Sequence, residues 1–286
     1  THAFGETTIP SVPSRVVSAG FTEQDSLLAL GVVPIATTEW FGGQPFGVWP
    51  WAQPKLGPAR PEVLNLDNGI QVDRIAALKP DLIVATNAGL DADTYQKLSA
   101  IAPTIAQSGT DAFFEPWKEQ ATAIGLAVFQ DETMKTLIKG VDDKFTAVGT
   151  DNARFKDKRA VLLQGTLWDN AIVATMPGWR TDFLTQMGFT IPDSIKGYAH
   201  DHRALIPLDQ AAAALDQADV LIWSTESDAD QAALLANPAI AGLAATTRNR
   251  NVFTGKDLAG AIAFSSVLSY PAVADQLPPL LATALA

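Results

Sequence analysis

Apolar residues recur at helical spacing near the middle of the chain, at Met134, Leu137, Ile138, Val141, Phe145 and Val148. This spacing places them on one face of a helix with about 3.6 residues per turn. Asp131, Glu132 and Thr133 precede them, and carboxylates favour the positive end of the helix dipole. The pattern predicts one helix over about 131–155, on the order of 35 Å long at about 1.5 Å per residue.

Short apolar runs alternate with helical patterns on both sides of this helix. Each apolar run predicts a strand, namely at 15–20, 32–38, 81–87, 104–106, 159–164, 219–223 and 251–253. Helices are predicted at 22–30, 72–78, 91–101, 115–126, 179–187 and 208–215, and from about Ala263 in a region interrupted at Pro271, Pro278 and Pro279. Residues from 39 to about 61 form a long loop rich in Gly, Pro and Trp, and a loop of more than ~15 residues usually serves a function.

The alternation of strands and helices predicts an α/β fold with two Rossmann-like lobes whose sheets are mostly parallel. The N-terminal lobe is predicted over 1–130, the helix that joins the lobes over 131–155, and the C-terminal lobe over 156–286. Ligands of parallel sheets lie at the carboxyl ends of the strands. We therefore expect the ligand in a cleft that both lobes share.

A faint internal repeat supports this division into two lobes. Residues 72–84 and 208–222 are each a predicted helix followed by an Asp-led buried strand. Both helices carry an Asp in the first turn, at Asp73 and Asp209. Such a repeat favours two equivalent halves.

Composition narrows the possible classes of function. Of the 286 residues, 47% are apolar and 18% are charged, and the net charge is −11. No cluster of Lys and Arg follows a helix face, so neither nucleic acid nor an anionic membrane is expected as a partner. No apolar run reaches the ~18 residues that a membrane span needs. The chain has no Cys, which excludes disulfides, thiolate zinc sites and iron–sulfur clusters.

Large aromatic and polar side chains gather at predicted strand ends and cleft loops. The candidate ligand-binding residues are Trp40, Phe41, Trp49, Trp51, Trp168, Trp179, Tyr198, His200, His202 and Arg203. Flat rings give a bulky organic ligand a large contact area at little entropic cost. The competing interpretation is ordinary packing, which we expect for Trp117 on its helix and Trp223 on its strand.

The densest polar cluster runs from His200 to Arg203. A His-x-His pair can hold a metal, and Arg180 or Arg203 can hold an anionic ligand. The third histidine of the chain is His2, near the N-terminus, so a three-His site has no further member. We predict no direct metal site.

Motifs of the common enzyme classes are missing. The chain has no Gly-x-Ser-x-Gly elbow, no phosphate loop, no dinucleotide-binding fingerprint and no Cys nucleophile. We therefore expect a binding protein and not an enzyme. An iron-chelate esterase and an adhesive surface protein are the alternatives from other classes. Product analysis would detect the first, and the second would show no ligand-dependent quenching of Trp fluorescence.

Four parts of the chain resemble the substrate-binding proteins of ABC importers for ferric siderophores, haem and vitamin B12. They are 13–17 with 27–32, then 73–83, then 97–104, and finally 208–210 with 219–221. The helix that leads into Lys79, Pro80 and Asp81 is the most specific of them. The resemblance covers nearly the whole chain in consistent order, and it implies two lobes joined by one rigid helix.

The resemblance implies an extracytoplasmic solute-binding protein that binds a ferric siderophore in the cleft and delivers it to an ABC permease. It implies no intrinsic cofactor, with iron entering only as a ferric chelate or as haem, and we expect a monomer. Haem and corrinoids are the alternative ligands. Haem needs an axial Tyr, His or Met, for which Tyr198, His200, His202 and Tyr270 are candidates.

In the resembling family, an acidic residue of each lobe docks onto basic residues of the permease. Asp73 and Asp209 occupy these positions, where the family typically has Glu. The competing interpretation is that each Asp only stabilises the N-terminus of its own helix, by ~0.3–1 kcal/mol. The resemblance favours docking.

The resemblance also implies export from the cytoplasm and tethering through a lipidated Cys upstream of the folded domain. Residue 1 is Thr and the chain has no Cys. We therefore expect the full-length gene to encode a signal peptide and an anchoring Cys before Thr1.

Overall fold

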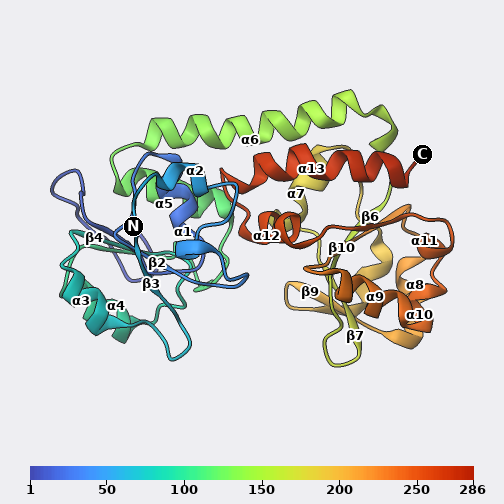
Figure 1. Cartoon of the computed structure of the whole chain (residues 1–286), viewed down its shortest axis with the longest axis horizontal. Coiled ribbons are helices and arrows are strands. Elements are labelled where there is room, and N and C mark those ends of the chain that lie inside the picture. The colour runs from blue at the N-terminus through green and yellow to red at the C-terminus, as the bar shows by residue number, and fades with distance from the viewer. The chain divides into compact units, whose positions relative to one another are not determined.

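A computed structural model describes all 286 residues, which divide into two compact units. Unit 1 comprises Thr1–Gly140 and Phe264–Tyr270, and unit 2 comprises Val141–Ala263 and Pro271–Ala286. The division falls inside the long helix α6 (Asp131–Asp151), which Figure 1 shows as one continuous rod. The 131–155 prediction thus ends four residues late, because a separate 3₁₀ turn, Ala153–Phe155, follows α6. The lobes were predicted over 1–130 and 156–286, whereas a late segment of the chain groups with unit 1.

Unit 1 contains a five-stranded, all-parallel sheet in the order β3-β2-β1-β4-β5. Its strands are β1 (Val16–Ser18), β2 (Ala36–Thr38), β3 (Glu62–Leu64), β4 (Leu82–Ala85) and β5 (Thr104–Ala106). The inner strands β1 and β4 are buried at every position, as a strand covered on both faces must be. Strand order reverses beside β1, so the loops after β1 and β4 diverge there, and ligands of open α/β sheets bind at such a point.

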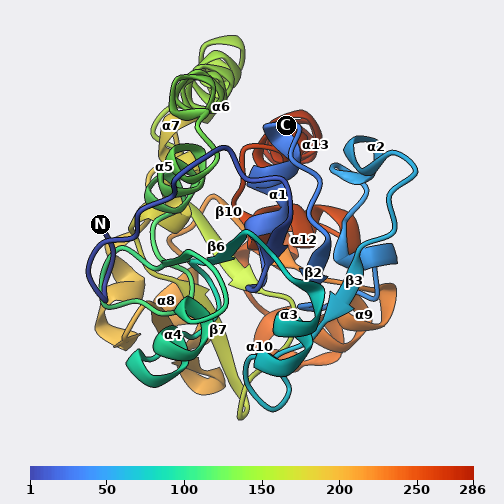
Figure 2. The same ribbon diagram turned by 90° about the vertical axis from the view of Figure 1, so that its left-hand side faces the viewer.

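Helices cover both faces of the unit 1 sheet. They are α1 (Glu23–Ala29), α2 (Gln53–Leu56), α3 (Val72–Leu78), α4 (Ala92–Ser99) and α5 (Trp117–Ala127), with a 3₁₀ turn at Pro45–Gly47. Figures 1 and 2 show α1 and α5 on one face of the sheet and α3 and α4 on the other. The segment after β2, which was predicted as one long loop, contains a 3₁₀ turn and the short helix α2. Its many Gly and Pro residues gave no helical pattern in the sequence.

Unit 2 contains a six-stranded mixed sheet in the order β11-β10-β6-β7-β9-β8. The strands are β6 (Ala160–Gln164), β7 (Ala171–Thr175), β8 (Ala199–His200), β9 (Arg203–Pro207), β10 (Val220–Ser224) and β11 (Asn251–Phe253). β6, β10 and β11 are parallel, as the strand–helix alternation predicts. β7, β8 and β9 pair antiparallel and were not predicted. The hairpin into β7 turns at Asp169 and Asn170, which have φ of 48° and 58°, as a two-residue hairpin turn requires.

The helices of unit 2 are mostly short. They are α7 (Asp182–Gln186), α8 (Ala211–Leu215), α9 (Asp228–Ala236), α10 (Pro238–Ala241), α11 (Ala244–Thr247) and α12 (Lys256–Phe264), and 3₁₀ turns lie at Trp179–Thr181, Asp193–Tyr198 and Leu208–Gln210. The final helix α13 (Ser269–Ala284) corrects one expectation, because it continues through Pro278 and Pro279. Its buried Val273, Leu277 and Leu281 offset the backbone hydrogen bonds that the prolines remove.

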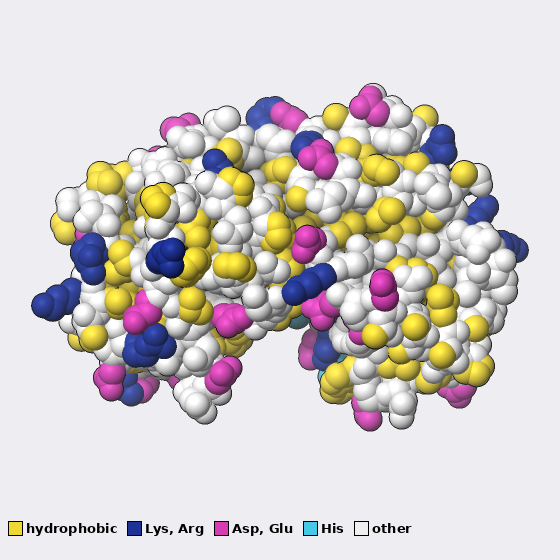
Figure 3. All heavy atoms as spheres, in the orientation of Figure 1, with side chains coloured by type: hydrophobic (Ala, Val, Ile, Leu, Met, Phe, Trp, Pro, Cys, Tyr) yellow, Lys and Arg dark blue, Asp and Glu magenta, His cyan; other side chains and the backbone are white.

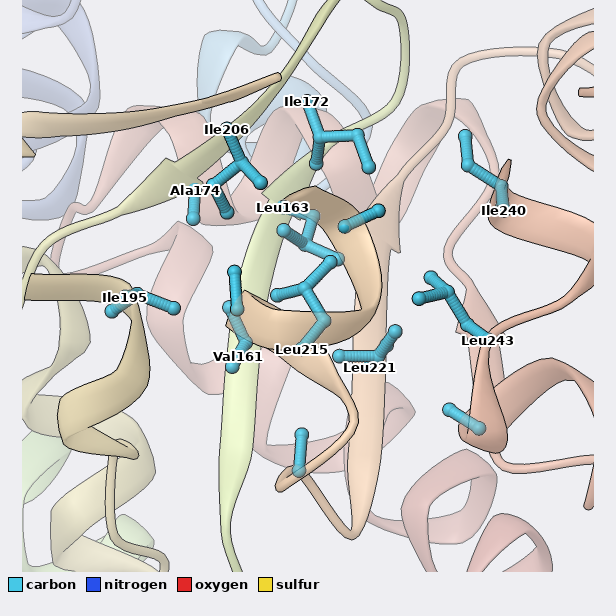
Figure 4. Close-up of a cluster of buried hydrophobic side chains, with 14 of the residues drawn as sticks. Val161, Leu163, Ile172, Ala174, Ile195, Ile206, Leu215, Leu221, Ile240 and Leu243 are labelled. Carbon is cyan, nitrogen blue, oxygen red and sulfur yellow. The ribbon is translucent and has the colours of Figure 1, made fainter. Parts of the chain in front are cut away.

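The core of unit 2 packs the face of the sheet against α8 and the helices near α10. Figure 4 shows Val161 and Leu163 of β6 facing Leu215 of α8, with Leu221 of β10 beside them. All four are at most 1% exposed. Trp223 is completely buried in the same cluster, and Trp117 of unit 1 is 8% exposed, which agrees with the packing interpretation of both.

Charged side chains of both signs are mixed on the face seen in Figure 3. Figure 3 shows Lys and Arg scattered among Asp, Glu and hydrophobic atoms on the visible face, with no basic patch. None of the helices combines the length and the apolar character needed to cross a bilayer.

Glu23 ties the loop after β1 to the loop after β4. Its carboxylate oxygens accept hydrogen bonds from the backbone N–H groups of Asn87, at 2.7 Å, and Thr22, at 3.0 Å. Gly20 makes room for this contact, because a Cβ atom there would lie against the Glu23 carboxylate and the carbonyl oxygen of Asn87. The Asn87 side chain also accepts the backbone N–H of Phe114 at 2.8 Å. The Glu23 carboxylate therefore ties the loops after β1 and β4 together, and the Asn87 side chain adds the loop after β5.

Replacing Leu221 with Ala should lower the free energy of unfolding by about 2–5 kcal/mol, because Leu221 is completely buried in the unit 2 core. Leu235→Ala is the matched control. Leu235 belongs to the same unit but is 36% exposed, so its loss should change stability by less than about 1 kcal/mol. Urea unfolding followed by circular dichroism measures both variants. Equal losses would contradict the packing described here.

Glu23 should make the stability of the fold depend on pH. Burial raises the pKa of Glu23 from 4.5 to about 7, despite the backbone hydrogen bonds that oppose the shift. Ionisation of Glu23 is therefore easier in the unfolded chain, and its contribution to stability falls as pH rises from about 4.5 to about 7. The expected loss is roughly 3 kcal/mol, at about 1.4 kcal/mol per pKa unit.

The measurement is urea unfolding of the wild type and of Glu23→Gln between pH 4 and 8. The Glu23→Gln variant loses a hydrogen bond at every pH, and this lowers its free energy of unfolding by a constant amount. Only the part of the difference between the two free energies of unfolding that changes with pH is therefore informative. A wild-type stability that rises relative to the variant across this range would show that Glu23 is ionised throughout.

Candidate functional site

Eight aromatic side chains of unit 1 form one connected group, which we call the aromatic cluster. It consists of Phe21, Trp40, Phe41, Trp49, Trp51, Phe113, Phe114 and Phe264. Phe21 follows β1, Trp40 and Phe41 follow β2, and Phe113 and Phe114 follow β5. Because the strands are parallel, these residues emerge at the same edge of the sheet, where ligands of α/β folds bind.

Phe21 is the centre of the exposed half of the cluster. Its ring stacks on Trp40 at a centroid distance of 5.6 Å and on Phe113 at 5.5 Å. Trp40 also contacts Phe114 at 4.9 Å and Phe41, edge-on, at 4.6 Å. Phe113 is 43% exposed, and the other four are partly exposed. These rings give unit 1 a broad apolar face that solvent can reach.

Trp49 and Trp51 form the inner half of the cluster. Their rings stack at 5.1 Å with an angle of 14° between the planes, and Phe264 packs edge-on against Trp51 at 5.3 Å. Trp49 is 1% exposed, because the chain at Gly42 passes directly over its ring. Gly42 has φ of 89°, and a Cβ atom there would collide with the Trp49 indole. In this structure Trp49 supports the other rings and is not itself accessible.

Asp25 holds the inner half of the cluster in place. Its Oδ2 atom accepts hydrogen bonds from Trp51 Nε1 at 2.7 Å and from Ser266 Oγ at 2.5 Å, while Oδ1 has no partner. Asp25 is completely buried, and burial raises its pKa to about 6, although both hydrogen bonds act in the opposite direction. The carboxylate thereby joins α1, Trp51 and the segment 264–270.

Unit 2 presents two pairs of Arg and Trp. The Arg203 guanidinium lies over the Trp168 ring at 5.4 Å, and the Arg180 guanidinium lies over the Trp179 ring at 4.4 Å. Trp168 is 49% exposed at the turn between β6 and β7. Stacking on the Trp168 ring restrains the Arg203 guanidinium, whose planar N–H groups can donate to oxygen atoms of a ligand.

Tyr198, His200 and His202 lie near the turn between β8 and β9. The Tyr198 hydroxyl donates to Gln210 Oε1 at 3.3 Å, and the His200 imidazole is 61% exposed beside Asp201. His202 is also exposed. Nowhere in the chain do three His, Asp or Glu side chains meet in an arrangement suited to a metal ion.

Asp73 and Asp209 are both exposed in the first turns of their helical segments. Asp73 lies in the first turn of α3, and Asp209 lies in the 3₁₀ turn that leads into α8. A carboxylate that docks on a partner protein must be exposed, and both of these are. An exposed Asp is equally compatible with a role limited to stabilising the start of its own helical segment. The docking role remains a prediction.

The structure thus gathers four predicted ligand residues, Trp40, Phe41, Trp49 and Trp51, in unit 1, and pairs Trp168 with Arg203 in unit 2. The sequence did not indicate several other members of the site, namely Phe21, Asp25, Phe113, Phe114 and Phe264. Arg180 was considered as an anion-binding residue, but its stacking on Trp179 was not predicted. The available signal was their position, since Phe21 and the Phe113–Phe114 pair each follow a predicted strand. Phe264 had no such signal, because it reaches the cluster from the far end of the sequence.

The aromatic cluster can bind flat or bulky apolar groups through contact area. Its two neighbouring carboxylates, Glu23 and Asp25, are both completely buried and already engaged in hydrogen bonds, so neither is presented to a reacting group. Binding without chemical change is the activity that this arrangement supports.

Comparison with known proteins supports the same conclusion. A solved periplasmic solute binding protein from Mycobacterium smegmatis str. MC2 155 is 67% identical, with a TM-score of 0.95, and the match covers 100% of this chain and 97% of that one. Two further relatives come from Bacillus subtilis (strain 168), and both were named provisionally. YhfQ, an ABC transporter substrate-binding lipoprotein, is 26% identical over 69% of this chain, and YfiY, a siderophore-binding lipoprotein, is 27% identical over 67%. The matched region spans only 59% and 57% of their lengths.

Residues 16–258 match the sequence profile of the family described as periplasmic binding protein. The match includes both sheets and the whole of α6. The predicted two-lobe α/β fold is confirmed, and so is the expectation of a binding protein and not an enzyme, because this family and the relatives above are solute-binding proteins. The chain belongs to the periplasmic-binding-protein family.

Proposed function

We propose that this chain is the substrate-binding protein of an ABC importer and that its ligand is a ferric siderophore. The aromatic cluster at the carboxyl edge of the unit 1 sheet is the observation on which the proposal rests. A siderophore wraps iron in a bulky organic shell, and five partly exposed rings, Phe21, Trp40, Phe41, Phe113 and Phe114, offer contact area suited to such a shell. The name of YhfQ, an ABC transporter substrate-binding lipoprotein, supports the role in an importer. The name of YfiY, a siderophore-binding lipoprotein, supports the siderophore as the ligand.

Iron is the cargo in this proposal and not a resident cofactor. The chelator already saturates the metal, so the protein needs no set of metal ligands of its own. Within unit 2, the Arg203 guanidinium over the Trp168 ring can donate N–H groups to oxygen atoms of an organic anion. Haem and corrinoids are the competing ligands, and the titration below distinguishes them. We further propose that the protein acts as a monomer.

We also propose that the protein works outside the cytoplasm on a lipid anchor and docks through Asp73 and Asp209. Both Bacillus relatives are named as lipoproteins, which supports the location. Exposed carboxylates steer association with a basic partner and set its orientation more than they stabilise the fold. Asp73 and Asp209 therefore serve recognition of the permease.

Removing one exposed ring should weaken binding of a ferric siderophore. Phe113→Ala should raise the Kd by roughly 5- to 30-fold, because it removes the most exposed ring of the aromatic cluster, worth about 1–2 kcal/mol of apolar contact. Phe129→Ala is the matched control, since Phe129 is 52% exposed in unit 1 but is not part of the cluster. It should leave the Kd unchanged.

The measurement is quenching of Trp fluorescence by ferric hydroxamate, ferric catecholate and ferric phenolate-oxazoline siderophores, and by haem and a corrinoid. Binding of haem with a Soret shift, but of no siderophore, would replace the proposed ligand with haem. Failure of every probe to bind at micromolar concentration would refute the proposed function. Equal effects of the two Phe variants would remove the aromatic cluster from the site.

Replacing Asp73 and Asp209 together with Ala should reduce siderophore uptake by cells while ligand affinity and unfolding midpoint stay the same. The double variant Asp93→Ala with Asp228→Ala is the control, because these residues are also exposed carboxylates in the first turns of helices, one in each unit. Uptake of radioactive iron and ligand titration are measured side by side. Normal transport by the Asp73 and Asp209 variant would leave these residues with only a local role at their helix starts.

A further inference from the structure

The first seven residues of the chain lie along one edge of the unit 1 sheet. β5 is an outer strand of that sheet, and the Ala3 N–H donates to the carbonyl of Gln107, directly after β5, at 2.8 Å. The Thr7 hydroxyl donates to the carbonyl of Thr104, the first residue of β5, at 2.7 Å. Residues 1–7, which we call the clasp, thus cover an edge that would otherwise present unpaired backbone groups.

His2 is the centre of the clasp. It is 7% exposed, and its ring lies edge-on against Tyr95 of α4 at a centroid distance of 5.0 Å. Phe4 stacks on the same Tyr95 ring at 5.1 Å. Two backbone hydrogen bonds between His2 and Gly5, at 2.8 and 3.0 Å, close the turn that brings both rings to Tyr95. The clasp therefore docks on α4 through ring contacts as well as on β5 through hydrogen bonds.

The hydrogen bonds around His2 define its protonation state. Nδ1 accepts the backbone N–H of Phe4 at 3.2 Å, so it carries no proton. Nε2 lies 2.7 Å from Thr7 Oγ1, and the Thr7 hydroxyl gives its own proton to the Thr104 carbonyl. Nε2 is therefore the donor to Thr7, and the Tyr95 hydroxyl, 3.2 Å from the same oxygen, can be a second donor. We assign His2 as neutral, with its one proton on Nε2.

A second proton on His2 disrupts this arrangement. It would occupy Nδ1, where it would face the N–H group of Phe4, and a buried cation would be left without a further acceptor. Burial lowers the pKa of His2 below its usual value of 6.5, and the nearby amino group of Thr1 acts in the same direction. Because the released clasp binds this proton more readily, docking is favoured above about pH 6.5 and weakens as the pH falls below it.

The charged groups around His2 do not compensate for its protonation. On the clasp itself, Glu6 is exposed, and its carboxylate accepts from the Thr1 hydroxyl at 3.4 Å. On α4, Asp93 is paired with Lys97 at 2.7 Å, and both are exposed. β5 contains no charged residue, and the side chains of α5 that line the neighbouring cavity are apolar. A charged imidazole in the docked clasp thus has no carboxylate partner.

Apolar surface lies next to the clasp. A cavity of about 240 Å³ is found where the clasp meets α5, and its lining includes Thr1, His2, Thr7, Ile105, Leu126 and Phe129. Leu126 and Phe129 are 60% and 52% exposed, whereas Ile105 of β5 is only 9% exposed. Release of the clasp would uncover Ile105 and widen this apolar surface, which is a measurable difference between the docked and the released state.

We propose that residues 1–7 form an acid-sensitive clasp, which neutral His2 holds on β5 and α4 and which protonation of His2 releases. The clasp is the part of the chain nearest to the proposed lipid anchor, and seven extended residues span at most about 25 Å. Release in acid would therefore lengthen the tether between the folded domain and the membrane. This consequence rests on the proposed function, whereas the clasp itself does not.

A nitroxide label at position 3 tests the clasp. The chain has no Cys, so Ala3→Cys provides a single attachment point on an exposed position of the clasp. We expect electron paramagnetic resonance to show a restrained label at pH 7.5 and a mobile one at pH 5, reversibly. Binding of an apolar dye should increase in parallel, while far-UV circular dichroism stays the same. Mobility that appears only together with a loss of circular dichroism would show acid unfolding and overturn the proposal.

Three variants assign the effect to His2. His2→Asn removes the titrating ring, so the labelled protein should lose its pH response. His200→Asn is the matched control, because His200 is an exposed histidine of unit 2, and the wild-type response should remain. Thr7→Val removes the hydroxyl that links His2 to Thr104 and should release the clasp at both pH values. An unchanged response in His2→Asn, or a restrained label in Thr7→Val, would contradict the proposal.

The anchored protein tests the consequence for the tether. The protein is attached to vesicles through its N-terminus, with a dye at Glu62→Cys, on the opposite edge of the sheet, and an acceptor dye in the lipid. Energy transfer should fall on acidification for the wild type but not for His2→Asn. Constant transfer would show that the clasp does not set the length of the tether.

These experiments use no ligand, so they fail separately from the proposed function. If no ferric chelate binds, the proposed function is wrong and the clasp is unaffected. If chelates bind but the label at position 3 has the same mobility at both pH values, the proposed function stands and the clasp is wrong.

Discussion

The close approach of the loops after β1 and β4 is the constraint on which the unit 1 site depends. The Glu23 carboxylate bridges them by accepting two backbone N–H groups, and Gly20 leaves the space in which it lies. Asn87 extends this contact to the backbone of Phe114. A buried acid is expensive to desolvate, which is visible in its raised pKa, but it satisfies donors that would otherwise be unpaired between diverging loops.

The aromatic cluster is a consequence of this geometry. Parallel strands deliver Phe21, Trp40 and Phe114 to one edge, and the short bridge through Glu23 and Asn87 brings their rings into contact. Asp25 acts similarly on the inner side, where one carboxylate oxygen receives both Trp51 and Ser266. The rings are therefore held by polar groups behind them, which leaves their faces available to a ligand. Rigid rings lose little entropy on binding.

The two units offer different chemistry despite their similar strand–helix plan. Unit 1 presents ring faces with carboxylates behind them, whereas unit 2 presents Arg180 and Arg203, each stacked on a Trp. The difference follows from the sheets. Unit 1 is entirely parallel and ends in loops, while unit 2 inserts the antiparallel β7 and β9, so that a hairpin carries Trp168 and a strand carries Arg203. Family membership alone would not have distinguished the two faces.

The sequence by itself determined the linking helix and seven of the eleven strands, whereas β3, β7, β8 and β9 were not predicted. The helical spacing of apolar residues in α6 and the continuous apolar runs of β4 and β10 involve only residues close together in the sequence. Such patterns can be recognised without knowing the rest of the fold. The tertiary structure alone decided that Trp49 is covered, that Phe264 joins the cluster, and that Pro278 and Pro279 remain helical. Each of these depends on neighbours distant in sequence. Burial, ring contacts and the pKa values of Glu23 and Asp25 are set by what packs against a residue, and that is not encoded in its immediate sequence.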